Sequence, residues 1–137
     1  MSQAVKTAAQ PANPARLQWG RIVAGALLVE IALMIVFVPL LAFTQAPWLM
    51  RLIAVGCFVF GFVISRWMVR KVRSRPVLHG ALIGVLATVI YLGLCLAAPG
   101  GIGPVIEMYG PFLFVLGNGL RIAGCMAGGL ALRQPVS

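Results

Sequence analysis

Charged side chains are scarce in this sequence. Only 9% of the 137 residues are charged and 61% are apolar, whereas a water-soluble domain carries about 25% charged residues. A soluble globule of this composition would lack the polar surface to cover itself, so lipid is the expected solvent. In lipid the backbone must close its own hydrogen bonds as helices or a barrel. The apolar runs are long and do not alternate as barrel strands would, so the sequence predicts an all-α membrane protein.

Acids, histidine and cysteine are also few. The acids are Glu30 and Glu107 alone, and the one histidine is His79. The three cysteines lie inside apolar runs without the spacing of a metal site, so we expect them to pack as small hydrophobes. They are Cys57, Cys95 and Cys125. Paired carboxylates, HExxH and glycine-rich phosphate loops are lacking. We therefore expect no catalysis, no cofactor and no metal, and we interpret His79 as an interfacial residue.

Four apolar runs are long enough to cross a bilayer. We place them near residues 21–43, 48–69, 77–98 and 111–132, within a transmembrane domain of residues 19–133. Residues 1–18 are polar and broken by prolines, which is typical of a disordered tail. The connection over residues 99–111 is interrupted by glycine and proline. The predicted fold is a polytopic four-helix transmembrane bundle with a disordered N-terminal tail.

Basic residues lie almost all on one side of this arrangement. Nine flank the termini and the middle loop, and only Arg51 lies on the other side. The nine are Lys6, Arg16, Arg21, Arg66, Arg70, Lys71, Arg73, Arg75 and Arg133. Positive residues favour the cytoplasmic side, so we predict a bacterial inner-membrane protein with both termini in the cytoplasm. The net charge of +9 is explained by this bias, and no motif indicates nucleic-acid binding.

The middle loop is the most basic segment. Its cations are Arg66, Arg70, Lys71, Arg73 and Arg75. We expect them to contact anionic lipid headgroups, which attract each basic residue by about 1 kcal/mol. A binding patch for a specific partner is the alternative.

Two charges interrupt the predicted spans. Glu30 lies in the first and Arg121 in the fourth, each near mid-membrane by the helical rise of about 1.5 Å per residue. A charge at that depth costs several kcal/mol unless it is paired. Opposite charges at equal depth on antiparallel spans predict an intramembrane ion pair.

Polar and small residues share faces with these charges. Residues three, four or seven positions apart lie on one face of a helix, and small ones there let helices approach closely. We predict a midplane polar cluster formed with Thr88, Tyr91 and Asn118. We also predict helix-packing glycines at Gly80, Gly84, Gly117, Gly124 and Gly128.

The string Gly25-Ala26-Leu27-Leu28-Val29-Glu30 resembles the opening of small multidrug resistance transporters. That resemblance implies a four-span fold whose first-span carboxylate exchanges protons with cationic drugs. The likeness ends there, because the third span lacks the family's tryptophan-containing pattern and Arg121 would repel cations. We do not assign the chain to that family.

Three functions remain open. The favoured one is a small inner-membrane protein with a structural or interaction role, in which the ion pair clamps the first and fourth spans. It would act in a homo-oligomer or a larger membrane complex, because four spans bury little of one another. The alternative is a minimal small-solute or ion transporter or channel that acts as an oligomer. A carboxylate held by arginine is a poor proton carrier, so proton coupling would require the pair to break. The most distant option is an enzyme that uses His79 on lipid phosphates.

Overall fold

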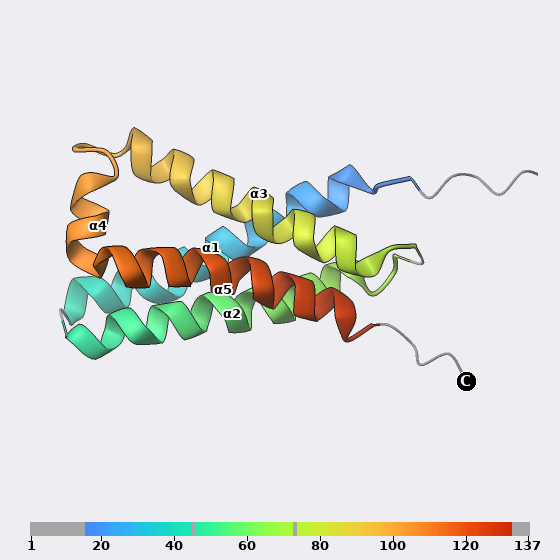
Figure 1. The fold of residues 1–137 in the computed structure, drawn as a ribbon, viewed down its shortest axis with the longest axis horizontal. Helices are drawn as coiled ribbons and strands as arrows, with labels where there is room; N and C mark the ends of the chain where they lie inside the picture. Colours follow the sequence, from blue (N-terminus) through green and yellow to red (C-terminus); the bar gives the residue numbers. More distant parts are fainter. Residues whose placement is uncertain (1–15, 45, 73, 133–137) are drawn as a thin grey trace, which may run out of the picture.

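The computed structural model describes residues 16–44, 46–72 and 74–132, and within them the chain is all helical. Four helices are long and apolar enough to cross a membrane (Figure 1). They are α1 (Trp19–Phe43), α2 (Pro47–Val69), α3 (Pro76–Ala97) and α5 (Pro111–Leu130). The predicted all-α fold with four long apolar helices is thus confirmed, and the helices support a multi-pass membrane protein. Residues 1–15 of the predicted tail lie outside the described residues.

Prolines mark the start of three of the four long helices. Pro47, Pro76 and Pro111 each occupy the first turn of a helix, where the missing N–H has no helical partner and the fixed φ suits the helix. Pro39 instead lies inside α1, which continues to Phe43. The helix there lacks only the one hydrogen bond that proline cannot donate.

A short fifth helix, α4 (Gly103–Tyr109), lies in the connection that was predicted to be irregular. Pro104 lies in its first turn, and Gly110 caps its end with a φ of 75°. Residues with side chains rarely adopt this φ, so glycine allows the sharp turn into α5. Figure 1 shows α4 lying across one end of the bundle. We call this end the α4 end.

The opposite end of the bundle collects the basic residues, and we call it the basic end. Here α1 and α3 begin, and α2 and α5 end (Figure 1). The described cations near it are Arg16, Arg21, Arg66, Arg70, Lys71 and Arg75. Arg21 Nη1 donates to the Met68 carbonyl over 3.1 Å, and the Gln18 N–H donates to His79 Nε2 over 3.1 Å. These two bonds fix the start of α1 against α2 and α3.

The four long helices form a ring in which α1 and α5 are diagonal. α5 packs along α2 and α3, and α1 packs against the same two helices from the other side. α2 and α3 make few contacts although they follow one another in the chain. The first and last spans therefore make few direct backbone contacts, and an ion pair between them has to reach across the ring.

Glycines close the half of the bundle nearer the basic end. A Cβ at Gly84 would lie 2.8 Å from the Ile122 Cα, and one at Gly124 would lie 2.9 Å from the Phe58 Cα. We call this contact region of α2, α3 and α5 the glycine seam. Its members are Gly61, Gly80, Gly84, Gly124, Gly128 and Gly129. Because each touches a neighbouring helix directly, the backbones approach closely and leave little space.

Large apolar side chains cover the outside of the bundle. Phe43 is 89% exposed, Phe112 74% and Ile35 68%. Such contiguous apolar surface is unfavourable in water and suits contact with lipid tails or other membrane helices.

Candidate functional site

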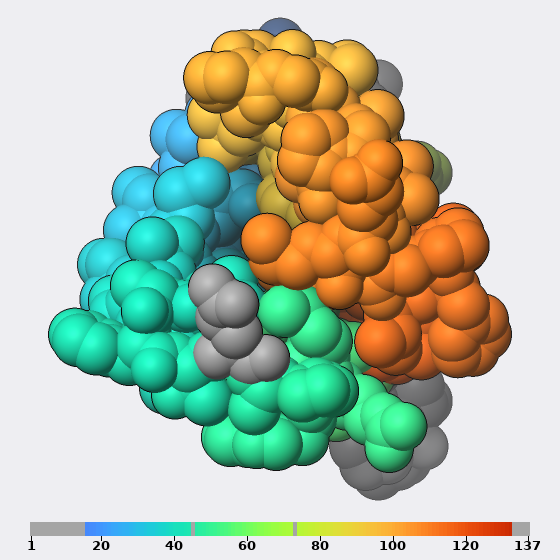
Figure 2. Space-filling model, turned by 90° about the vertical axis from the view of Figure 1, so that its left-hand side faces the viewer, coloured from blue at the N-terminus to red at the C-terminus, as the bar shows by residue number. Residues whose placement is uncertain are grey.

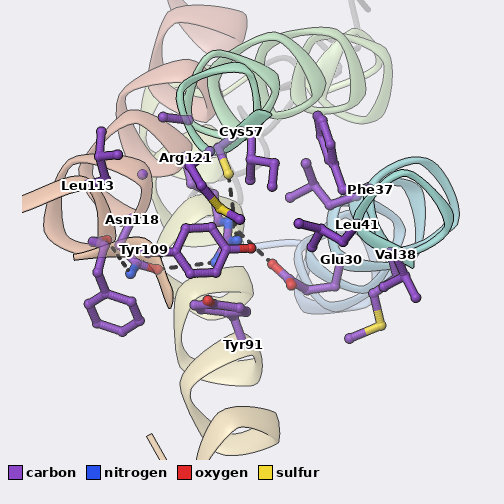
Figure 3. Close-up of a pocket in the computed structure, with 17 residues that line it drawn as sticks. Glu30, Phe37, Val38, Leu41, Cys57, Tyr91, Tyr109, Leu113, Asn118 and Arg121 are labelled. Atoms are coloured by element: carbon purple, nitrogen blue, oxygen red, sulfur yellow. Dashed lines mark hydrogen bonds and ion pairs between the residues drawn. The ribbon is translucent and has the colours of Figure 1, made fainter. Parts of the chain in front are cut away.

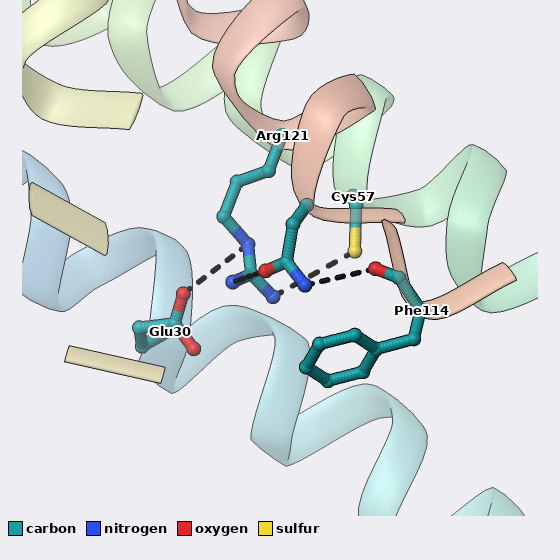
Figure 4. A network of polar contacts seen from close by, with 5 residues as sticks. Glu30, Cys57, Phe114 and Arg121 are labelled. Carbon is teal, nitrogen blue, oxygen red and sulfur yellow. Dashed lines mark hydrogen bonds and ion pairs between the residues drawn. The ribbon is translucent and has the colours of Figure 1, made fainter. Parts of the chain in front are cut away.

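The structure brings Glu30 and Arg121 together in the centre of the bundle. Arg121 Nε lies 3.3 Å from Glu30 Oε1, and each residue is 4% exposed (Figure 4). α1 supplies the carboxylate and α5 the guanidinium, so the ion pair spans the diagonal of the ring. The two atoms are close, but each lacks a hydrogen-bond partner among the described residues. The pair therefore neutralises charge without saturating either group.

Three further groups hold Arg121 in place. Nη1 donates to Asn118 Oδ1 over 3.2 Å, and Nη2 contacts the Cys57 sulfur at 3.8 Å. The guanidinium carbon lies 4.5 Å from the centre of the Tyr91 ring, within the range of a cation–π interaction. Asn118 is itself fixed, because its Nδ2 donates to the Phe114 carbonyl over 2.8 Å. A guanidinium offers five N–H groups, so hydrogen-bonding capacity remains.

The structure thus places Tyr91 and Asn118 beside the ion pair, but not Thr88. The hydroxyl oxygen of Thr88 is buried and has no hydrogen-bond partner within the described part of the chain. Thr88 also does not line the cavity that reaches the pair. Among the described residues, its hydroxyl therefore makes no hydrogen bond to the polar cluster: sharing a depth in the membrane does not mean sharing a contact.

Replacing Thr88 with valine should stabilise the protein. The two side chains have the same shape, and the substitution removes a buried hydroxyl that has no partner, for which the expected gain is about 1 kcal/mol. Thermal unfolding in detergent measures this. A lower unfolding temperature would show that the hydroxyl has a partner in the folded protein, such as a bound water.

A cavity of about 150 Å³ reaches the ion pair from the α4 end. Figure 3 shows side chains of α1, α2, α3 and α5 converging on it. Its polar lining is Glu30, Tyr91, Tyr109, Asn118 and Arg121. The remaining lining is mostly apolar, with Phe37, Leu41, Ile53 and Leu113 among it. A compound with an apolar body and one polar end fits this distribution.

A second, wider cavity of about 520 Å³ lies against the α4 end. It shares Leu41, Met50, Tyr109 and Leu113 with the first, so the two adjoin. Arg51 lines the wider cavity. Figure 2 views the bundle from this end and shows the surface hollowed between α1 and the segment of α3 and α4. Together the cavities lead from the surface to the ion pair.

Tyr109 of α4 lies where the two cavities meet. Figure 3 shows its ring among the side chains that line the first cavity, as Arg121 does. Burial raises the pKa of its phenol above the ordinary value, and the positive charge of Arg121 only partly lowers it. The hydroxyl therefore stays neutral and can donate or accept a hydrogen bond at this point. No sequence pattern indicated this role, because Tyr109 lies in a connection without helical periodicity of its own.

Cys57 is the second cavity residue that sequence analysis missed. It was interpreted as a packing cysteine, yet it lines the cavity and contacts Arg121. Cys95 and Cys125 are buried elsewhere in the bundle and do not line it. Gly117 also lines the cavity. A Cβ added there would meet no atom of the described part of the chain within 4 Å, so Gly117 is not at a contact between described helices, contrary to the prediction. Gly80, Gly84, Gly124 and Gly128 do lie at such contacts.

His79 lies in the first turn of α3, next to the basic loop, and its side chain is buried. It is 2% exposed; Nε2 accepts from Gln18, and Nδ1 lies 3.1 Å from the Arg75 carbonyl. With Nδ1 donating, a neutral ring satisfies both contacts. The histidine connects helix ends and does not face the basic loop with a free nitrogen.

The basic end carries a shallow pocket between α1 and α2. Arg21, Trp67, Met68, Arg70 and Lys71 line it. Of the residues predicted to contact anionic lipid, Arg70 and Lys71 are therefore part of a pocket. Arg66 and Arg75 are exposed elsewhere at this end, and Arg73 lies outside the described residues.

Among the residues that the structure describes, no group of three or more histidine, cysteine, aspartate or glutamate side chains could hold a metal ion. No protein-family model, curated protein or solved structure matches the chain. Function must therefore be inferred from the site itself.

Proposed function

We propose that this is a multi-pass protein of the bacterial inner membrane that binds a small solute above its buried ion pair, as a minimal transporter. The observation that supports it is the cavity that leads from the α4 end to Glu30 and Arg121. Small-molecule sites are typically concave and mostly apolar, with a few converging polar groups. Binding and transfer require no bond-making step, so no catalytic chemistry is part of the proposal.

The two halves of the bundle support this assignment because they differ. The glycine seam closes the half toward the basic end, whereas bulky side chains of α5, such as Leu113 and Phe114, border open space in the other half. A bundle held only by a clamp gains nothing from a cavity at its charged centre. A protein that receives a solute from one side needs such a one-sided opening.

The basic residues support an orientation with the basic end in the cytoplasm. The cavity then opens away from the cytoplasm. We further propose that the protein works as a homo-oligomer or in a larger membrane complex, because its exposed apolar surface leaves room for helix contacts. Anionic lipid is the partner proposed for the pocket of Arg21, Arg70 and Lys71, since basic pockets at this interface attract anionic headgroups.

Thiol labelling tests both the cavity and its orientation. A variant that keeps Cys57 and carries alanine at the other two cysteines should react with sulfonatoethyl methanethiosulfonate, a small membrane-impermeant reagent. We expect modification in spheroplasts, where the outer face is presented, at least ten times faster than in inverted vesicles. Mass spectrometry of the purified protein measures the extent of modification.

The matched control keeps Cys125 alone. Its side chain is fully buried at the glycine seam, so it should stay unmodified from both sides. Faster labelling of Cys57 in inverted vesicles would reverse the proposed orientation. Failure to label it from either side would contradict a solute-accessible cavity.

A structural or interaction role is the second candidate, and the ion pair itself favours it. A contact that spans the ring diagonal can fix all four long helices without any ligand. The two candidates predict different results for a variant in which uncharged residues replace both Glu30 and Arg121. If the role is structural, a variant without both charges keeps its function in the membrane complex; if solute is bound there, that variant folds but loses binding.

A further inference from the structure

The two partners of the buried ion pair are not equally replaceable. A guanidinium keeps its positive charge inside proteins, whereas a carboxyl group in apolar surroundings can take a proton and become neutral. Arg121 therefore needs a negative partner at all times. Glu30 needs a positive partner only while it is ionised.

The contacts show the same difference. Arg121 is held by Asn118, Cys57 and Tyr91 in addition to Glu30. Glu30 has no hydrogen bond within the described residues, and Arg121 is its ion-pair partner. If the ion pair opens, we expect the guanidinium of Arg121 to stay in place and the carboxyl group of Glu30 to move away from it.

Charge balance then selects the ligand. An organic anion can take the place of Glu30 on Arg121, and one proton on Glu30 leaves the cavity neutral again. A cation bound at Glu30 would place a second positive charge beside Arg121, which like-charge repulsion opposes. Among the described residues, the other titratable groups that line the cavity supply no further positive charge: they are Cys57 from α2, Tyr91 from α3 and Tyr109 from α4.

The cavity fixes the approximate size of the ligand. An engineered protein cavity of about 150 Å³ binds benzene, and the volume here is about 150 Å³. The apolar lining receives the body, and the free N–H groups of Arg121 receive a carboxylate, which suits their planar geometry. Arg51 in the adjoining wider cavity attracts anions to the opening.

We propose that the cavity binds a small monovalent organic anion, the size of benzoate, together with one proton that passes from water to Glu30. The anion replaces Glu30 as the partner of Arg121, and net charge in the membrane does not change. This inference rests on the proposed function, because it names the solute class of the same cavity. It adds that binding is coupled to protons.

Isothermal titration of the purified protein with benzoate, benzyl alcohol and benzylamine tests the inference. The three probes share a ring and differ in charge. We expect benzoate to bind at least ten times more tightly than the other two. Titration in two buffers with different heats of ionisation should show uptake of one proton per benzoate. Its affinity should fall about tenfold for each pH unit of increase between pH 6 and 8, as linkage to one proton requires.

Two variants test whether Glu30 is the group that takes up the proton when benzoate binds. Glu30→Gln mimics the protonated acid, so benzoate should bind without proton uptake and without pH dependence. Glu107→Gln removes the only other acid, which is exposed on α4, and should leave proton uptake unchanged. If Glu30→Gln does not fold, benzenesulfonate, which stays ionised between pH 6 and 8, replaces benzoate as the probe. Uptake of one proton per bound benzenesulfonate by the wild type and by Glu107→Gln then places the proton on the protein and not on Glu107, and absence of uptake would overturn the coupling.

Each outcome has a distinct meaning. Equal or tighter binding of benzylamine or benzyl alcohol would overturn the anion assignment and leave the solute-binding cavity standing. Benzoate binding without proton uptake by the wild type would overturn the coupling. Failure of all three probes to bind would contradict the proposed function as well.

Discussion

Replacing Glu30 with glutamine is expected to lower the free energy of unfolding by about 3–5 kcal/mol. The substitution keeps the shape of the side chain and removes its charge. Arg121, which is 4% exposed, then lies in the apolar interior without a counter-charge and cannot become neutral by losing a proton. Folded yield and thermal unfolding in detergent, at low concentrations of added organic anions, measure the loss.

The opposite substitution, Arg121→Met, should cost less. The carboxyl group left behind can take a proton and remain buried as a neutral acid. Removing both charges together should restore much of the stability, because apolar residues often replace a buried ion pair without loss. The expected order of stability is therefore wild type close to the double variant, then Arg121→Met, then Glu30→Gln. Glu107→Gln is the control for loss of an acid and should change little.

The deciding comparison is between the stability lost in the double variant and the sum of the losses in the two single variants. If the double variant is as unstable as the sum of the two single variants, the charges do not interact in the folded protein, and the site described above does not exist. If Arg121→Met is more damaging than Glu30→Gln, the asymmetry that underlies anion exchange is absent. Benzoate added to Glu30→Gln should raise its unfolding temperature, because it supplies the missing negative charge.

Replacing Gly124 with alanine is expected to lower the free energy of unfolding by about 3 kcal/mol, at the upper end of the usual cost of overpacking. The added methyl group would press on the backbone of Phe58, including its carbonyl oxygen. Backbone cannot rotate away as a flexible side chain can, so α2 and α5 must separate. Thermal unfolding and cysteine reactivity of Cys125 in the same seam both report the separation.

Two glycines of the same helix are matched controls for Gly124. A Cβ at Gly117 or Gly119 would meet no atom of the described residues within 4 Å. Alanine favours a helix over glycine by about 1 kcal/mol, so Gly117→Ala and Gly119→Ala should be neutral or stabilising. The same substitution is then expected to lower the free energy of unfolding at Gly124 and to leave it unchanged or raise it at the other two positions of the helix. Equal destabilisation at all three positions would mean that helix packing is not the cause.

Much of the site follows from spacing along the chain. A rise of about 1.5 Å per residue places Glu30 and Arg121 at similar depth, and each charge is costly there without a partner. Helical periodicity also places Asn118 on the face of Arg121, where the two are hydrogen-bonded. The depth of a residue and the face it shares follow from the geometry of its own helix, so the sequence is sufficient to predict them.

Other features depend on which helices are neighbours. Gly117 and Gly124 share one face of α5, yet Gly124 touches α2 and Gly117 borders the cavity. Thr88 and Tyr91 lie a turn apart on α3, but only Tyr91 stacks on Arg121. A helical period tells which residues share a face, but it does not tell what lies opposite at each level.

By itself, the sequence determined that the chain is helical, that four segments are fit to cross a membrane, and that two opposite charges lie in them. These follow from composition and from the cost of exposing polar groups to lipid. Only the tertiary structure decided that α1 and α5 are diagonal, that glycines close one half of the bundle, and that a cavity leads to the ion pair through the other. The physical reason is that packing depends on side-chain volumes summed across several helices, and no single segment carries that information.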